Sequence, residues 1–170
     1  MRVPDDEGDL IGRVRRGDAQ ALAEVYRRHA PDLMGLAHRV TGSRADAEDI
    51  VHDVFVGLPE ALERYEERGK VASWLRRLTV RRALTQRRRR RRYVPLEAGA
   101  VARDDHTIDR TALEGALRAL PDKLRVVFVL REIEGYTHAE IAELLGIRRG
   151  TSEVRLHRAM RALRRKLEVE

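Results

Sequence analysis

The sequence predicts an all-α protein in which two small helical domains are joined by a flexible linker, the second domain being a helix-turn-helix. Apolar residues recur at intervals of three and four along most of the chain, and no segment alternates convincingly as a strand would. Charged residues make up 37% of the 170 residues and aromatic residues only 4%, so the core must be aliphatic, as in small helical bundles. We expect the first domain over 1–92, the linker over 93–108 and the second domain over 109–170.

The first domain should consist of helical segments over 9–15, 19–29, 31–40, about 44–65 and about 71–92. Pro59 lies inside the fourth segment. Because proline lacks a backbone N–H and its ring clashes with the preceding turn, we expect a kink or a break near 55–58. The fifth segment ends in the arginine block 87–92, which by composition alone is a solvated tail or a non-specific nucleic-acid patch.

The apolar periodicity stops after Tyr93, where Pro95, Gly99 and an acidic pair favour a linker. It resumes over 113–120, pauses at Pro121 and continues to Leu130. We therefore expect two short helices ahead of the helix-turn-helix.

The helix-turn-helix begins with a capping box, since Thr137 and Glu140 are three residues apart. Tyr136 and Ile141 are spaced as a hydrophobic staple requires, and Gly146 can adopt the left-handed conformation that ends a helix. A capped helix, a tight turn and a second helix are typical of a motif that enters the DNA major groove.

The second helix of the motif is strongly basic, with eight arginines and lysines over 148–166 against one acidic residue. Phased on an inward Leu156, its buried side should hold Ala159, Met160, Leu163 and Leu167. Its outer side should hold Thr151, Val154, Arg158, Arg161 and Arg165. The capped helix before it favours groove insertion over the alternative of a solvated basic helix.

Composition narrows the class of partner and the compartment. The net charge of +7 favours a polyanion, because neutralised phosphates release condensed counterions. The absence of cysteine excludes disulfides and thiolate metal sites, which fits a reducing cytosol. No apolar window is long enough to span a membrane, so we expect a cytoplasmic protein with no membrane insertion.

An acidic segment over 46–55 contrasts with this charge. Asp46, Asp49 and Asp53 share one predicted helical face, which suggests a metal or acid–base site, simple complementarity to the helix dipole, or a docking face for a basic protein. No Gly-rich loop, nucleophile or second ligand cluster accompanies them. We therefore expect no catalytic residue, no metal and no cofactor.

The helix that contains Trp74 mixes an aromatic ring with Arg77, Arg81 and Arg82. Such a surface can stack unpaired bases beside phosphate-binding charge. The competing interpretation is that Trp74, the only tryptophan, simply fills the core.

Three segments in order now carry a resemblance to a known family. Residues 46–55 resemble the polymerase-binding segment of bacterial sigma factors, 72–92 their promoter-melting helix, and 120–165 their carboxyl-terminal domain. With no extra amino-terminal region or middle domain, the chain looks like the small extracytoplasmic-function (ECF) group of the sigma-70 family. The resemblance implies three partners: core RNA polymerase, promoter DNA and an anti-sigma factor.

The resemblance also implies roles for individual residues. Those that would dock on core polymerase are Asp46, Glu48, Asp49, Ile50, Asp53, Val54 and Phe55. Those that would hold single-stranded minus-ten DNA, with the loop around 65–70, are Lys70, Trp74, Arg77, Arg81 and Arg82. Those that would read double-stranded minus-35 DNA are Arg148, Arg149, Thr151, Glu153, Val154, Arg155 and Arg158. The alternative is a two-domain helix-turn-helix regulator that does not join polymerase; a nucleic-acid enzyme that uses the acidic segment is a third class.

The chain departs from the family at two places. The family usually has apolar, basic and small polar residues where this chain has Ser152, Glu153 and Val154. Either the second helix starts later than the phasing assumes, or Val154 offers its methyl groups to a thymine methyl and Glu153 accepts from a cytosine amine. Pro59 is the other departure, because a larger side chain is common there.

Overall fold

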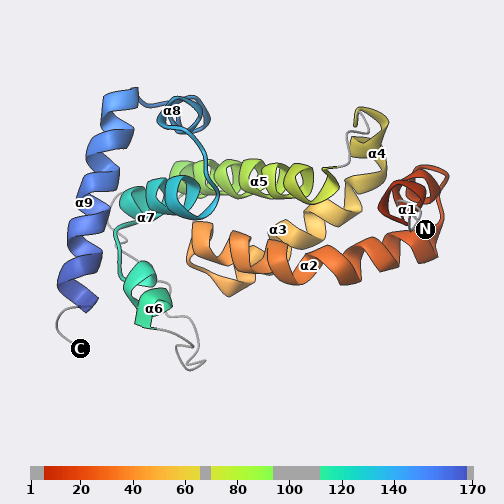
Figure 1. The fold of residues 1–170 in the computed structure, drawn as a ribbon, viewed down its shortest axis with the longest axis horizontal. Coiled ribbons are helices and arrows are strands. Elements are labelled where there is room, and N and C mark those ends of the chain that lie inside the picture. Colours follow the sequence, from red (N-terminus) through yellow and green to blue (C-terminus); the bar gives the residue numbers. More distant parts are fainter. Residues whose placement is uncertain (1–5, 66–69, 94–111, 168–170) are drawn as a thin grey trace, which may run out of the picture.

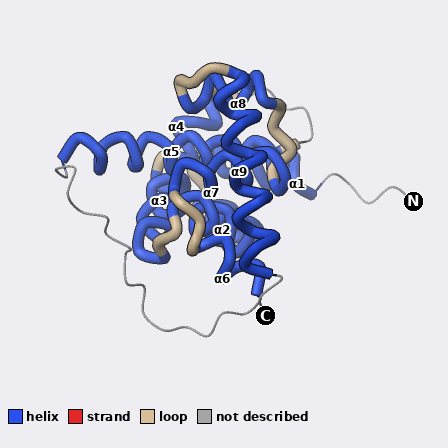
Figure 2. Tube along the Cα trace, turned by 90° about the vertical axis from the view of Figure 1, so that its left-hand side faces the viewer, coloured by secondary structure: helices blue, strands red, loops and turns tan. Residues whose placement is uncertain are grey.

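The computed structural model describes residues 6–65, 70–93 and 112–167, and these residues form helices and turns with no strand among them (Figures 1 and 2). The predicted all-α class is confirmed. The predicted linker lies, apart from Tyr93, outside the described residues. The elements of the amino-terminal unit are α1 (Asp6–Arg15), α2 (Ala19–Thr41), α3 (Arg44–Val56), α4 (Leu58–Glu63) and α5 (Val71–Tyr93). Those of the carboxyl-terminal unit are α6 (Ala112–Arg118), α7 (Asp122–Phe128), the π-helix η1 (Val129–Ile133), α8 (His138–Leu145) and α9 (Arg149–Leu167).

The long helix α2 replaces the two segments expected over 19–29 and 31–40, because it continues through Pro31. Its start is fixed by Asp18, whose carboxylate accepts the N–H groups of Gln20 and Ala21 at 2.9 and 3.1 Å. Packing of α2 against both α3 and α5 along its length outweighs the backbone hydrogen bond lost at the proline.

The break expected at Pro59 is confirmed. Helix α3 ends at Val56, Gly57 separates the two helices, and Pro59 stands in the first turn of α4. The missing N–H of proline costs nothing in a first turn, because that group has no partner within the helix.

The helix-turn-helix has the caps that its sequence predicts. The hydroxyl of Thr137 accepts the N–H of Glu140, whose carboxylate accepts the N–H of Thr137 at 2.8 Å. Gly146 ends α8 with a φ of 64°, and α9 begins three residues later. Both caps are local, which is why spacing alone could predict them.

A π-helix precedes the helix-turn-helix and was not expected. The N–H of Glu134 donates to the carbonyl of Val129 at 3.0 Å, a five-residue step that an α-helix does not make. The N–H of Tyr136 then donates to the carbonyl of Leu130 at 2.9 Å, across Gly135 with its φ of 74°. The wider turn sets the direction in which Glu134 and Tyr136 leave the helix.

The two units share one hydrophobic core. A single cluster of buried side chains runs from Leu10 of α1 to Ile141 of α8 and includes Val127 and Leu130. Helix α7 packs on α2, and α8 packs on α5 (Figure 1). A smaller cluster under α9 contains Leu120 and Leu163. The interface between the units, called the seam below, is therefore part of the fold.

Candidate nucleic-acid and protein interfaces

The acidic surface of α3 is smaller than the sequence predicted. Glu48, Asp49 and Asp53 are exposed, but Asp46 is only 5% exposed. The carboxylate of Asp46 accepts a hydrogen bond from Nε2 of Gln86 at 3.0 Å and pairs with Arg90 at 2.5 Å. Asp46 thus ties the start of α3 to α5, and the expectation that it shares the outer face with Asp49 and Asp53 is wrong.

The apolar residues expected to contact polymerase are mostly core residues. Ile50, Val54 and Phe55 are 1, 4 and 6% exposed, because they form the side of α3 that packs into the amino-terminal unit. Two other side chains supply exposed apolar area beside them. Val56 is 67% exposed, and Tyr26, 46% exposed, meets Phe55 edge-on with ring centroids 4.9 Å apart. Tyr26 lies on α2, outside the segment 46–55, so that segment alone could not predict its presence on this surface. It directly follows Val25, which is buried.

The basic residues proposed for minus-ten DNA lie on the outside of α5 and at its start. Lys70, Arg77, Arg81 and Arg82 are all exposed. Trp74 is half-buried and lies on Tyr65, with ring centroids 4.6 Å apart and a tilt of 44°. Trp74 packs on the core cluster, so its interpretation as core filler holds in part, and a role in stacking unpaired bases stays a prediction. Most of the loop expected to help, 66–69, lies outside the described residues.

Helix α9 begins at Arg149, so the suggestion of a later helix start is wrong. Ser152 is fully buried, and its hydroxyl lies 2.9 Å from Nδ1 of His138. Val154 is 50% exposed, and Glu153 pairs with Arg149 at 3.0 Å. The inverted polarity is therefore real: a polar side chain points inward and an apolar one outward.

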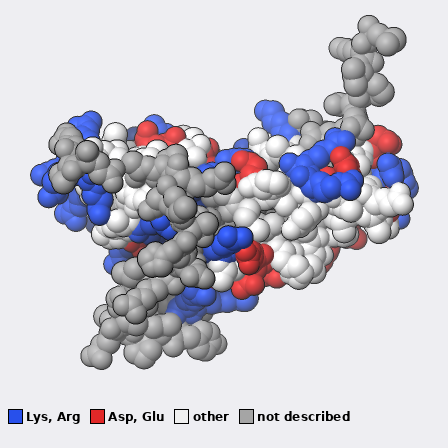
Figure 3. Space-filling view, turned by 90° about the horizontal axis from the view of Figure 1, so that it is seen from below, with Lys and Arg blue, Asp and Glu red and all other residues white. Residues whose placement is uncertain are grey.

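The remaining residues proposed for minus-35 DNA are exposed or half-exposed near the start of α9. Arg148 and Arg158 are exposed, whereas Thr151 and Arg155 are half-buried. Figure 3, seen from the side of the carboxyl end of α9, shows Lys and Arg gathered at the end of the molecule where this helix lies, whereas elsewhere on this face they alternate with Asp and Glu.

The buried side of α9 is narrower than predicted. Ala159 and Leu163 are buried, but Met160 and Leu167 are 37 and 43% exposed. Helices α6 and α7 pack against α9, and each has only seven residues. They therefore shield only a narrow strip of the α9 surface from solvent.

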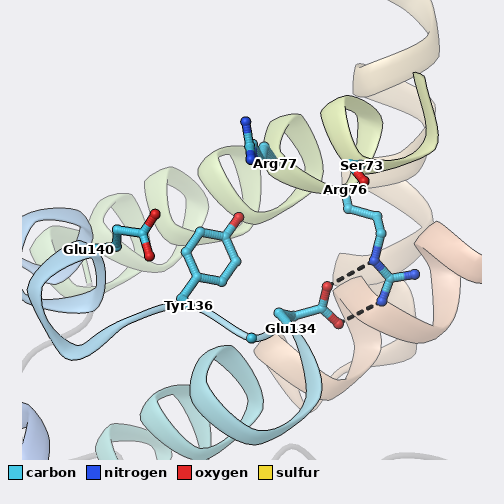
Figure 4. A pocket seen from close by; sticks show the side chains of 7 residues that line it. Ser73, Arg76, Arg77, Glu134, Tyr136 and Glu140 are labelled. Carbon is cyan, nitrogen blue, oxygen red and sulfur yellow. Dashed lines mark hydrogen bonds and ion pairs between the residues drawn. The ribbon is translucent and has the colours of Figure 1, made fainter. Parts of the chain in front are cut away.

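The surroundings of three side chains in and next to the helix-turn-helix shift their pKa values. The backbone N–H and then the hydroxyl of Thr137 lower the pKa of Glu140. The hydrogen bonds that Arg76 donates to Glu134 (Figure 4) and to Asp32 raise the pKa of its guanidinium above the usual range, the bonds to Glu134 having the largest effect, and burial opposes them. Burial raises the pKa of Tyr136.

Neither a metal site nor a membrane span is found in the described part of the chain. No three His, Cys, Asp or Glu side chains gather there as metal ligands would. No helix among these residues is both long and apolar enough to cross a membrane.

These surfaces define a helical DNA-binding protein with an acidic face suited to a protein partner, and comparison with known proteins gives its family. The model of sigma-70 region 2 matches residues 25–93, and the model of sigma-70 region 4 matches residues 110–163. The first match lies in the amino-terminal unit from α2 onward, and the second lies in the carboxyl-terminal unit. The chain belongs to the sigma-70 family, in its ECF group of RNA polymerase sigma factors.

Several relatives are ECF sigma factors. SigE of Mycolicibacterium smegmatis is 32% identical over 163 residues, which cover 87% of this chain but only 63% of SigE. SigM of Mycobacterium tuberculosis is 30% identical over 165 residues, covering 95% of this chain and 84% of SigM. SigW of Bacillus subtilis is 26% identical over 176 residues, covering 92 and 94%.

Two solved structures share the fold of this chain. RpoE of Bartonella quintana, in complex with the anti-sigma factor NepR, aligns with a TM-score of 0.59 at 22% identity, covering 87% of this chain and 97% of RpoE. CnrH, in complex with the cytosolic domain of CnrY, aligns with a TM-score of 0.54 at 23% identity, covering 95 and 96%.

Proposed function

We propose that this protein binds core RNA polymerase and directs it to promoters by holding two DNA elements at once. The observation that carries the proposal is that regions 2 and 4 of the family occur in one chain and bear two separate basic surfaces, on α5 and α9. An acidic face on α3 accompanies them. A regulator that does not join polymerase requires no such face, so the sigma-factor function is favoured over the alternative.

The exposed side chains of α9 and α5 indicate which promoter element each helix binds. Helix α9 enters the major groove of the minus-35 element, where Thr151 and Val154 meet base edges and the arginines meet phosphates. Helix α5 holds unpaired bases of the minus-ten element, which stack on Trp74 between Arg77 and Arg81. Unstacking costs a few kcal/mol per base, so contacts by both units and by polymerase together drive strand opening.

The acidic residues Glu48, Asp49 and Asp53 dock on a basic surface of polymerase, with Tyr26 and Val56 adding apolar contact. In this proposal the protein helps the polymerase–promoter complex to open its DNA strands, and it neither forms nor breaks a covalent bond. It therefore needs no catalytic residue and no cofactor. It acts in the cytoplasm, where polymerase and DNA are found. We propose that residues 1–92 form the domain that binds polymerase and the minus-ten element, 93–108 the linker, and 109–170 the domain that binds the minus-35 element.

An anti-sigma factor is a further partner in this proposal. RpoE and CnrH, which share the fold, were each solved with such a protein or with part of a partner protein. The test is to titrate candidate anti-sigma proteins into a transcription reaction and measure loss of promoter-specific product.

The central experiment mixes the protein with core polymerase and a promoter library, then maps transcription start sites. Co-elution with core at low salt and starts at a shared pair of sequence elements are expected. DNA binding without co-elution would instead support the helix-turn-helix regulator. Activity without polymerase that depends on a divalent metal would support an enzyme.

Strand opening is tested separately with Arg81→Ala, because Arg81 is exposed and its loss should leave the fold intact. We expect reduced transcription from duplex promoters and near-normal transcription from templates with a pre-opened minus-ten region. Equal loss on both templates would remove Arg81 from the melting surface. Arg27→Ala, an exposed arginine on α2, is the control for lost positive charge.

A further inference from the structure

Arg15, the last residue of α1, reaches the carboxyl end of α4. Its Nε donates to the carbonyl of Leu62 at 3.2 Å, and its Nη2 donates to the carbonyl of Tyr65. The last carbonyl groups of a helix have no partner within that helix, and a cation beside them also interacts favourably with the helix dipole. Arg15 therefore caps the end of α4 from a different helix.

Helix α1 is fixed in place, so Arg15 is held by a rigid element. Ile11 and Val14 are buried, and α1 packs against both α2 and α4. Nε of Arg13 donates at 2.8 Å to the carboxylate of Asp18, the residue that caps the start of α2. Figure 1 shows α1 and α4 together at the end of the molecule opposite α9.

Tyr65 depends on Arg15 for its position. Its side chain is buried, yet its hydroxyl has no hydrogen-bond partner among the residues that the structure describes. The guanidinium carbon of Arg15 lies 5.9 Å from the centre of the Tyr65 ring, within the range of a cation–π contact. The ring is therefore held by packing, by this contact and by the bond from Arg15 to the Tyr65 carbonyl, and not by its own hydroxyl.

Tyr65 in turn supports Trp74, the aromatic residue of the proposed minus-ten surface. The two rings lie with their centroids 4.6 Å apart. A ring that is already fixed in one orientation loses little further conformational freedom when a base stacks on it, so its affinity for the base is higher. The contacts from Arg15 to Tyr65 and from Tyr65 to Trp74 thus link α1 to the start of α5.

We propose that Arg15 is a positioning residue for the minus-ten surface: it holds Tyr65 against Trp74, so that the Trp74 ring is oriented before an unpaired base arrives. The effect on DNA rests on the proposed function, whereas the contacts are a property of the free chain. Arg15 lies outside residues 25–93, which match sigma-70 region 2, and before the first segment that resembles the family.

The test uses Trp74 as its own reporter, because it is the only tryptophan of the chain. Arg15→Ala removes the contacts, and the exposed position of Arg15 makes the change compatible with folding. Arg15→Lys keeps the charge but lacks the rigid fork of donors that reaches two carbonyls at once. Arg16→Ala, at the neighbouring exposed arginine, is the matched control for lost charge.

The first measurement is made on the free chain. Arg15→Ala should make Trp74 fluorescence more sensitive to quenching by acrylamide and shift its emission to longer wavelength, because Tyr65 no longer stays against the ring. Arg15→Lys should resemble Arg15→Ala more closely than the wild type. Arg16→Ala should not differ from the wild type. Ser43→Ala removes the side-chain cap of α3 and is the control for a general loss of stability.

The second measurement uses the complex with core polymerase and a fluorescent promoter fragment whose minus-ten region is unpaired. Arg15→Ala and Arg15→Lys should each lose about fivefold in affinity, as part of the stacking energy of a base is lost. The slope of affinity against salt should stay the same, because no phosphate contact is removed. Affinity for a duplex that carries only the minus-35 element should also stay the same.

Unchanged Trp74 fluorescence in Arg15→Ala overturns the proposal. Full affinity in Arg15→Lys, or a salt slope smaller by about one in Arg15→Ala, also overturns it, because Arg15 would then act as a charge on a phosphate. Equal effects in Ser43→Ala would reduce the role of Arg15 to general stability. If the wild type forms no complex with polymerase, the proposed function fails, and the fluorescence of the free chain still decides whether Arg15 positions Tyr65.

Discussion

Nδ1 of His138 and the hydroxyl of Ser152 lie 2.9 Å apart and join the first residue of α8 to the buried side of α9. The bond gives the fully buried hydroxyl a partner, and an unpartnered hydroxyl there would destabilise the motif. Because one end of the bond lies in each helix of the motif, it also helps to fix the angle between α8 and α9.

Ser152→Ala and His138→Ala should each lower the free energy of unfolding by about 1–3 kcal/mol, because each leaves a polar partner without its hydrogen bond. The double variant should cost clearly less than the sum of the two, as expected for residues in direct contact. Urea unfolding followed by circular dichroism measures all three. Strict additivity would contradict a direct bond, and His157→Ala, at an exposed histidine of α9, is the control.

Asp49→Arg should weaken binding to core polymerase by at least about tenfold, because it reverses a charge on the exposed acidic face. Helicity and affinity for isolated DNA should hardly change. Asp46→Asn is the matched comparison: it breaks the ion pair with Arg90 and should cost about 1–2 kcal/mol of stability while polymerase binding is kept. A titration of core polymerase with labelled protein, run beside urea unfolding, separates the two effects. Large loss of helicity in Asp49→Arg would make that residue structural.

Val154→Ser should change which minus-35 sequences are preferred, by about fivefold at the base pair it contacts. The valine side chain is half-exposed on the outer side of α9, where its methyl groups can meet a thymine methyl. The salt dependence of binding should stay the same, since the phosphate-binding arginines are unchanged. A promoter library read by sequencing gives the answer, and identical preferences in variant and wild type would contradict the prediction.

The capping box should make stability depend on acid pH. Bonds from Thr137 lower the pKa of Glu140 from 4.5, so its contribution is complete above about pH 4.5 and is lost as pH falls through the lower folded-state pKa. Glu140→Gln, which cannot titrate, should be less stable than the wild type near neutral pH, and the difference should shrink below about pH 4.5. Thermal unfolding at a series of pH values measures it. A difference that is constant with pH would contradict the role of the carboxylate, and Glu143→Gln on the same helix is the control.

Features set by local chemistry were predictable from the sequence. The capping box of Thr137 and Glu140, the glycine at 146 and the break before Pro59 each depend on residues a few positions apart. Pro31 shows the limit of that logic, because packing along the whole of α2 carries the helix through it. Periodicity identifies the apolar side of a helix but not the neighbour that covers it.

The site was predicted less completely for the same reason. Asp46 resembles Asp49 in sequence, yet its partner Gln86 lies 40 residues away and removes it from the surface. Arg76 and Glu134 are 58 residues apart, and no local pattern links them. Tyr26 joins the docking face from a different helix. Contacts between distant helices decide which member of a charged or apolar set is accessible.

The π-helix η1 makes the seam sensitive to chain length as well as to side-chain chemistry. It fits one residue more than an α-helical turn would between Val129 and Glu134. Loss of a single codon in this stretch would restore regular α-helix and rotate the residues beyond it by about 100°. Glu134 would then leave Arg76, although the side chains proposed to contact DNA would all be retained. A deletion of one residue here would therefore remove a contact between the two units without removing either partner of that contact.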